Sequence, residues 1–187
     1  GNAGVQEGQA ATTGYMLFKR FNRSISKTSP GVASQNRPSI IFRLADFYLI
    51  YAEVANEVNP SDSRVLTYLN LVRERAGLPK VEILNPGIVG NKELQRGAIQ
   101  RERQIELATE GQRYFDVRRW MIADKDGEGR QNGYAHGMNV RGTINDTEEF
   151  NRVVETEKIV FNRKMYLQPI PDHEMRKTQN LVQNPGW

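Results

Sequence analysis

Cysteine is absent from this sequence, which excludes a disulfide framework, a cysteine zinc cluster and a catalytic thiol. Histidine is scarce. His136 and His173 lie far apart with no acidic partner at metal-ligand spacing, so we expect no metal site. The sequence also lacks a G-x-S-x-G motif, a Ser-His-Asp order and a phosphate-binding glycine loop. These absences argue against an enzyme, and we predict no catalytic residue and no cofactor.

Long apolar runs are missing too, because none approaches the ~20 residues that a membrane-spanning helix needs. The chain has 187 residues, of which 38% are hydrophobic and 26% charged, as in an ordinary globular domain. The formal net charge is +4, but cations alternate with acids, as in Arg101-Glu102-Arg103. A salt-bridged helical surface is therefore the favoured interpretation, and we expect no nucleic-acid partner.

The segment ERQIELATEGQRYFDVRRW (102–120) is rich in both signs of charge. Glu102, Glu106 and Glu110 recur at i, i+4, a spacing at which like charges destabilise a helix unless cations offset them. We predict a partly buried structural ion network where two helices meet, made of Glu102, Arg103, Glu106, Glu110, Arg113, Asp116, Arg118 and Arg119. A glycosidase would instead need a carboxyl pair with one protonated member, and the surplus of arginines disfavours that alternative.

Apolar periodicity predicts four helices, at about 41–57, 60–76, from Asn91 onward, and 113–121. The expected buried stripes are Leu44, Phe47, Tyr48, Tyr51, Ala52 and Ala55 in the first helix, Val65, Leu69, Val72 and Ala76 in the second, Leu94, Ala98, Ile105 and Ala108 in the third, and Tyr114, Val117 and Met121 in the fourth. Asn59-Pro60 is expected to start the second helix, and Gly77 to end it. The short link between the first two predicts an antiparallel helical hairpin, the unit of tetratricopeptide-type repeats, although the 34-residue repeat pattern itself is poorly matched, and the tetratricopeptide-like assignment depends on the family resemblance described below.

Strand signals are weaker. Residues 14–21 alternate as a strand does, and the glycine-rich stretch 124–139 is expected to be an exposed loop. Two short apolar runs, 159–161 and 165–167, flank a turn at 162–164 and predict a small β-hairpin near the C-terminus. The predicted fold class is therefore mainly α (α+β), with helical hairpins and this small β element.

Four segments in order resemble one known family. Segment 102–120 resembles the C-terminal region of the SusD/RagB family, and RLADFYLIYAEVANE (43–57) and LNLVRERAGLP (69–79) resemble its helices. KMYLQPIPDHEM (164–175) with QNPGW (183–187) resembles its closing elements. The resemblance covers 37–120 and 159–187 well. It implies a non-catalytic, surface-exposed outer-membrane lipoprotein of Bacteroidetes that captures glycans and serves as the lid of a SusC-like TonB-dependent transporter.

The resemblance also shapes the expected organisation. A lipoprotein needs an N-terminal lipidated cysteine, so we expect a C-terminal portion whose anchor, its only membrane contact, lies outside this chain. We predict a single region, 1–187. It comprises an extended or strand lead-in (1–36), helical hairpins (41–121), a loop (122–158), and a hairpin and tail (159–187).

Sugar recognition needs an exposed aromatic ring beside hydrogen-bonding groups. Asn132, Tyr134 and His136 are the candidate ligand-binding residues, although Tyr134 is also compatible with an ordinary loop tyrosine. Tyr114 and Trp120 are expected in the core, and Trp187 is expected to pack. The acidic run from Asp124 to Gly129 matches the first half of a calcium loop, but Ala135 stands where a bidentate glutamate is needed, so an acidic solvent-exposed turn is favoured.

Three functions are therefore weighed. Polysaccharide or oligosaccharide capture predicts an exposed aromatic with amide neighbours in one shallow groove. A helical-repeat module for a protein or peptide partner predicts an apolar or charged face on the first two helices. A glycosidase, the weakest alternative, predicts a carboxylate pair that arginines do not contact.

Overall fold

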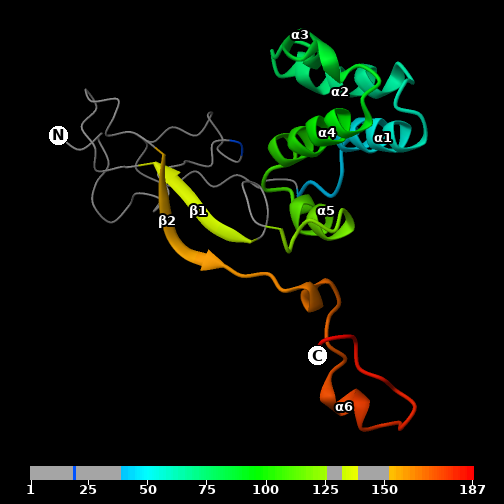
Figure 1. Cartoon of the computed structure of the whole chain (residues 1–187), viewed down its shortest axis with the longest axis vertical. Coiled ribbons are helices and arrows are strands. Elements are labelled where there is room, and N and C mark those ends of the chain that lie inside the picture. Colours follow the sequence, from blue (N-terminus) through cyan, green and yellow to red (C-terminus); the bar gives the residue numbers. More distant parts are fainter. Residues whose placement is uncertain (1–18, 20–38, 126–131, 139–151) are drawn as a thin grey trace, which may run out of the picture. The chain divides into compact units, whose positions relative to one another are not determined.

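The computed structural model describes residues 19, 39–125, 132–138 and 152–187 (Figure 1). Its helices are α1 (Leu44–Val58), α2 (Arg64–Arg75), α3 (Val81–Leu84), α4 (Lys92–Glu106), α5 (Gln112–Arg119) and α6 (Asp172–Met175), with 3-10 turns η2 (Pro86–Ile88) and η3 (Arg163–Tyr166). Its strands are β1 (Gly133–Met138) and β2 (Arg152–Ile159). The predicted fold class, mainly helical with a small β element, is confirmed.

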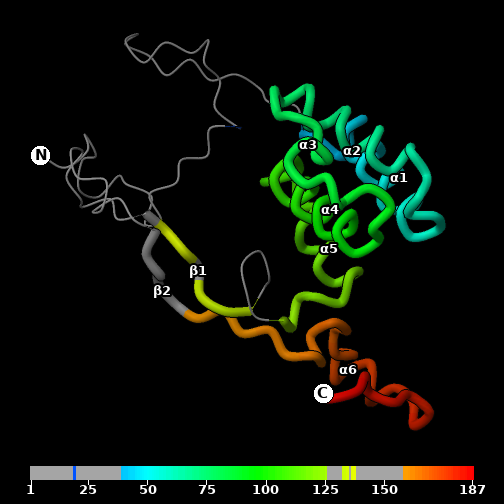
Figure 2. Tube along the Cα trace, turned by 45° about the horizontal axis from the view of Figure 1, so that its top comes forward, coloured from blue at the N-terminus to red at the C-terminus, as the bar shows by residue number. Residues whose placement is uncertain are grey.

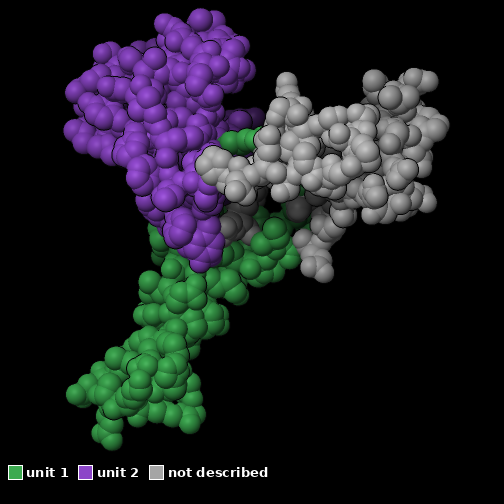
Figure 3. All heavy atoms as spheres, turned by 180° about the vertical axis from the view of Figure 1, so that it is seen from behind, with its two compact units in different colours: residues 1–36, 120–187 green, residues 37–119 purple. Residues whose placement is uncertain are grey.

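The chain divides into two compact units, which Figure 3 shows in different colours. The helical unit spans 37–119, and the second unit combines 1–36 with 120–187. The single region expected from the length stays a prediction. No helix in the described ranges is long and apolar enough to cross a bilayer.

In the helical unit, α1 and α2 form a hairpin, and α4 packs against both (Figure 2). The core lies between them and is built from aliphatic side chains with almost no exposed surface, chiefly Leu49, Val65, Leu69, Val72 and Ile99. Their burial is the main stabilising contribution, at about 1.5–3 kcal/mol for each side chain of this size.

The helix ends follow local chemistry. The Asn91 side chain accepts a hydrogen bond from the Leu94 N–H at 3.1 Å, as predicted for the cap of α4. Gly77 has φ +77°, and the N–H of Leu78 reaches the carbonyl of Arg73, which closes α2 with a Schellman motif. Asn59-Pro60 does not start α2, however, because the helix begins only at Arg64.

The buried face of α1 differs from the predicted stripe. Ala52 is buried and Tyr48 and Ala55 are partly buried, but Leu44, Phe47 and Tyr51 are exposed. The helix instead buries Ala45, Asp46, Leu49, Ala52 and Asn56. Phe47, Ile50, Val54 and Val58 give it a second apolar face, which is exposed. Two apolar faces on one helix make the stripe ambiguous in sequence.

The predicted face of α4 is confirmed at Ala98, which packs against the core, but is wrong at Leu94, Ile105 and Ala108, which are exposed. Leu94 and Ile105 are 43% and 59% exposed, whereas Gln95, Ile99, Glu102 and Arg103 are buried. Hydrophobic periodicity misses this face because ion pairs bury charged residues there.

Two further core predictions also change. In α2, Val65, Leu69 and Val72 are buried as predicted, but Ala76 is exposed. In α5, Val117 is buried, whereas Tyr114, predicted in the core, is 44% exposed and Met121 is exposed as well. Trp120 is intermediate in exposure.

The β element lies elsewhere than predicted. β1 pairs antiparallel with β2 from Gly133↔Ile159 to Met138↔Arg152, with a register irregularity after Tyr134. Part of the predicted loop 124–139 is therefore strand β1, while 126–131 lies outside the described residues. The run 165–167 is not a strand, because Arg163–Tyr166 forms η3. Of the predicted strand 14–21, only Lys19 is described.

Candidate functional site

The charged residues of 102–119 lie in the helical unit and contact arginines and acids of two other segments, α1 with its N-cap Arg43, and α2. Arg43 donates from Nη1 to the Glu106 carboxylate at 2.5 Å and from Nη2 to Glu110 at 2.9 Å. Arg75 reaches the same Glu106 oxygen at 2.5 Å. The i, i+4 repulsion between Glu106 and Glu110 is thus offset by a shared guanidinium. Hydrogen bonds to Glu110, and then to Glu106, raise the pKa of Arg43.

A second, buried cluster centres on Arg103. Its guanidinium contacts Asp116 on α5 and Asp46 on α1, and Asp116 also accepts from Arg119 at 2.9 Å. Arg119 in turn pairs with Glu53, and this hydrogen bond is the main cause of the raised pKa of Arg119.

The network has two further features. Arg73 contacts Glu102 at 2.9 Å, which links α2 to α4. Arg118 donates to the Tyr114 carbonyl and stacks on the Tyr114 ring at 3.5 Å, while Arg113 is half-buried on the same helix. These ion pairs join α4 to α1, α2 and α5, so the carboxylates and arginines hold the helices together. We therefore assign these residues a structural role, as a proposal.

The second unit holds the three predicted ligand-binding residues, and the structure separates their environments. Asn132 donates from Nδ2 to the Asp124 carbonyl at 2.9 Å, and its Oδ1 accepts from the Phe161 N–H. Tyr134 is 54% exposed on β1, with the Lys158 ammonium 6.0 Å from its ring centre. His136 is half-buried on the same strand. Only Tyr134 offers an open aromatic surface.

Asn132 instead supports a different aromatic residue, Tyr166. The Tyr166 hydroxyl donates to the Asp124 carboxylate at 2.6 Å and accepts from the Asp124 N–H at 3.1 Å. Its ring packs edge-on against Phe161, which is buried, at 5.0 Å between centroids. Asn132 bonds to the backbone of both Asp124 and Phe161, so the two residues that hold Tyr166 are themselves tied together. Tyr166 is therefore fixed at its edge and at its hydroxyl.

The contact between Tyr166 and Asp124 shifts the pKa values of both groups. The hydrogen bond from Tyr166 lowers the pKa of Asp124. Burial, reinforced by the bond to Asp124, raises the pKa of Tyr166. At neutral pH the pair is therefore a phenol that donates to a carboxylate, in a stable arrangement.

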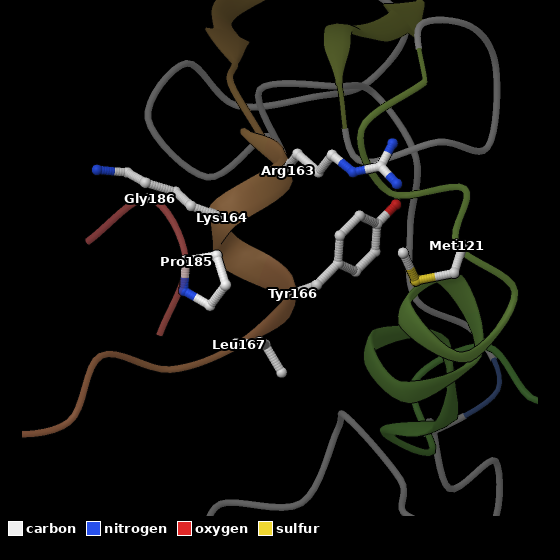
Figure 4. A pocket seen from close by; sticks show the side chains of 7 residues that line it. All are labelled: Met121, Arg163, Lys164, Tyr166, Leu167, Pro185 and Gly186. Atoms are coloured by element: carbon white, nitrogen blue, oxygen red, sulfur yellow. The ribbon is translucent and has the colours of Figure 1, made fainter. Parts of the chain in front are cut away.

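A pocket of about 540 Å³ opens beside Tyr166 (Figure 4). Its lining is mostly apolar, and the residues that form it are Met121, Arg163, Lys164, Tyr166, Leu167, Pro185 and Gly186. Figure 4 shows the Arg163 guanidinium lying near the Tyr166 hydroxyl and the Met121 side chain on the facing wall. This volume is in the range of about 300–1,000 Å³ typical of small-molecule sites.

The C-terminal tail closes one side of this pocket. The Gln183 amide pairs with both the N–H and the carbonyl of Ile170, at 2.8 and 2.9 Å. Asn184 donates to the Gln168 carbonyl at 2.6 Å. The Trp187 indole N–H donates to the carbonyls of Lys164 and Leu167, each at 3.0 Å. Trp187, predicted to pack, is anchored through its indole N–H, but the residue is 44% exposed.

The sequence does not single out Tyr166 or Arg163, because its pattern predicts a strand at 165–167 and an ordinary turn at 162–164. An available signal was the aromatic residue beside the rigid Pro169-Ile170-Pro171 segment, which cannot join a sheet interior. For the calcium alternative, Asp126 and Glu128 lie outside the described residues, and Ala135 is in β1. Within the described part of the chain, no three acidic or histidine side chains are grouped as metal ligands are.

Comparison with known proteins decides the family. The SusD family model matches residues 1–187. This chain belongs to the SusD family. SusD-like protein P25 of Formosa agariphila is 44% identical over 106 residues, which cover 57% of this chain and 19% of P25. SusD-like protein P2 of the same organism is 32% identical over 152 residues, which cover 79% of this chain and 26% of P2.

Solved structures agree. A SusD-like protein from Bacteroides fragilis matches with a TM-score of 0.63 and 31% identity, over 80% of this chain and 26% of that one. This SusD family chain therefore spans about a quarter of the length of that structure and of P2. SusD family proteins are in general non-catalytic glycan binders in nutrient uptake and are typically outer-membrane surface lipoproteins.

Proposed function

We propose that this chain belongs to a surface-exposed outer-membrane lipoprotein that captures oligosaccharides and hands them to a SusC-like TonB-dependent transporter. The observation that carries the proposal is membership of the SusD family over residues 1–187. Capture requires no bond making or breaking, which agrees with the arginine contacts of Glu102, Glu106 and Asp116. A glycosidase acid would need a carboxyl group that can hold a proton near neutral pH.

Two aromatic surfaces of the second unit support glycan capture. Tyr134 presents an open ring on β1, with His136 on the same strand. Tyr166 presents a fixed ring in a pocket. Aromatic faces match the apolar face of a pyranose, and nearby polar groups bind its hydroxyls. We retain Tyr134 and His136 as candidate contacts and assign Asn132 a positioning role through its backbone bonds.

The test is affinity gel electrophoresis of the chain against a panel of polysaccharides, with Tyr134→Ala and Tyr166→Ala beside the wild type. Retardation by one glycan, lost in one variant only, supports capture and assigns the ring that contacts the sugar. Circular dichroism of each variant checks that the fold is retained. Retardation by no glycan contradicts capture by this chain.

That negative result would favour a helical-repeat module for a protein or peptide partner. The observation behind this alternative is the exposed apolar face of α1, formed by Phe47, Ile50, Val54 and Val58. Exposed apolar faces of this kind commonly mark surfaces that bind other polypeptide. The Tyr134→Ala and Tyr166→Ala variants would then be expected to behave as wild type.

A further inference from the structure

The pocket beside Tyr166 carries positive charge but no acid. Arg163 and Lys164 are the charged residues of its lining, and the other lining residues are apolar or aromatic. Lys164 places its ammonium 4.3 Å from the Trp187 ring centre, on the tail side. Arg163 lies near the Tyr166 hydroxyl (Figure 4). A ligand that enters the pocket therefore meets a cation close to an aromatic ring.

The Arg163 guanidinium has its donors available. Among the residues that the structure describes, none accepts a hydrogen bond from it or forms an ion pair with it. A guanidinium carries five N–H donors and binds planar anions in a bidentate manner. Asp124 is the acid whose pKa Arg163 influences, but its carboxylate accepts from Tyr166 and does not line the pocket. The pocket thus presents positive charge at this wall, which the Asp124 carboxylate behind Tyr166 offsets only from outside the lining.

The aromatic ring below this cation is preorganised. Asp124 holds the Tyr166 hydroxyl, Phe161 packs against the ring edge, and Asn132 ties those two together. A ligand that stacks on Tyr166 does not have to order it first, which lowers the entropic cost of binding. Gly186 also matters, because a Cβ there would lie 2.9 Å from the Lys164 Cβ. The C-terminal tail therefore lies so close to η3 at Gly186 that a residue with a side chain would not fit there.

From this geometry we infer that the pocket is a subsite for one anionic sugar unit, a pyranose bearing a carboxylate or a sulfate. The sugar ring stacks on Tyr166, and the anionic group binds Arg163, whose guanidinium lies near the Tyr166 hydroxyl in Figure 4. The inference rests on the proposed glycan capture and narrows its substrate class. Arg163 is exposed, so its guanidinium can reach a carboxylate or sulfate on a bound sugar; a neutral sugar offers no such charge-assisted hydrogen bond, and an anionic unit therefore binds more tightly.

Isothermal titration calorimetry of the full chain tests this subsite. The probes are a galacturonate oligomer (carboxylate), a sulfated galactan oligomer (sulfate) and a neutral galactan oligomer of equal length. Arg163→Gln is expected to weaken binding of the anionic probe about tenfold, the effect of one charge-assisted bond. The matched control is Arg176→Gln, which removes the same charge from the exposed C-cap of α6, where Arg176 pairs with Asp172. It is expected to change affinity less than about twofold.

The outcomes separate the inference from the proposed function. If Arg163→Gln lowers the affinity for an anionic oligomer and Arg176→Gln does not, the result supports the subsite. The anionic oligomer that binds then shows whether the sugar carries a carboxylate or a sulfate. Equal weakening by Arg163→Gln and Arg176→Gln means a diffuse charge effect and overturns the subsite. Equal affinity for neutral and anionic probes also overturns the subsite but leaves glycan capture standing. Binding of no probe here, with no retardation across the wider polysaccharide panel, contradicts both.

Discussion

Arg103 and Asp116 form a bidentate ion pair, from Nε and Nη2 of the guanidinium to the two carboxylate oxygens at 2.9 and 3.1 Å. Their side chains are only 2% and 5% exposed. The remaining donor, Nη1, reaches Asp46 at 2.8 Å, so one guanidinium joins α4, α5 and α1. Burying a guanidinium is costly because it loses its hydration. The cost is offset only when its N–H donors are paired with acceptors in good geometry.

Removing Arg103 is expected to destabilise the chain severely. Arg103→Met keeps the aliphatic bulk but leaves Asp46 buried without its cation and Asp116 with Arg119 alone. Breaking a buried pair in this way costs about 3–5 kcal/mol. Urea denaturation followed by circular dichroism measures the loss. The matched control Arg176→Met removes an exposed pair to Asp172 and is expected to cost at most about 1 kcal/mol. Similar losses in both variants would contradict a special role for Arg103.

This cluster also explains how far the sequence could predict the helical unit. The helices, the Asn91 cap and the Gly77 terminus were predictable because each depends on local chemistry. The buried face of α4 was not, because Arg103 and Glu102 look like surface residues in a periodicity analysis. Their burial depends on Asp46 and Arg73, which are distant in sequence.

Glu106→Ala is expected to lose stability while leaving glycan retardation unchanged. Glu106 holds both Arg43 and Arg75, and its side chain is mostly buried, so its removal leaves two cations without this acceptor. The expected loss is about 1–3 kcal/mol in urea denaturation. Glu74→Ala is the control, since Glu74 is exposed and its contact to Lys80 is 3.7 Å. An unchanged fold with lost ligand binding would refute the structural assignment of Glu106.

The candidate site was harder to predict than the fold. The glycine-rich stretch 124–139 indicates that Tyr134 is exposed, and the structure agrees. Tyr166 could not be predicted because its position depends on Asp124, which bonds its hydroxyl, and on Phe161, which packs against its ring. Asn132 ties these two residues together through their backbones, although they are far apart in sequence. A contact between side chain and backbone of this kind leaves no periodic signal in a sequence.

Two glycine substitutions are expected to have opposite signs. Gly97 lies within α4, and an added Cβ would meet nothing within 4 Å. Gly97→Ala is therefore expected to stabilise the chain by about 0.5–1 kcal/mol through reduced backbone freedom in the unfolded state.

Gly186 has φ +88°, and an added Cβ would lie 2.9 Å from Lys164 Cβ. Gly186→Ala is expected to displace the tail and shift Trp187 fluorescence. An unchanged emission spectrum would contradict the close approach of tail and η3.

Acid is expected to weaken the contact between α1 and α4 at Glu57. Its carboxylate accepts from Arg96 at 2.7 Å and lies 3.0 Å from the Lys92 ammonium. The bond from Arg96, chiefly, lowers the pKa of Glu57 from its ordinary 4.5 to about 2. A carboxyl with a depressed folded-state pKa stabilises the fold above its unfolded pKa. That contribution disappears as the pH falls through the folded pKa.

The measurement is the difference in Tm between wild type and Glu57→Gln across the pH range. Near neutral pH the wild type is expected to melt higher, by a modest amount because Glu57 is partly exposed. Between the unfolded pKa of 4.5 and the folded value of about 2, the difference should shrink toward zero, since a protonated Glu57 resembles glutamine. Comparing the two variants cancels the acid sensitivity of all other carboxyls. A difference that stays constant down to pH values near the folded pKa would mean that the Arg96 and Lys92 contacts contribute nothing to stability.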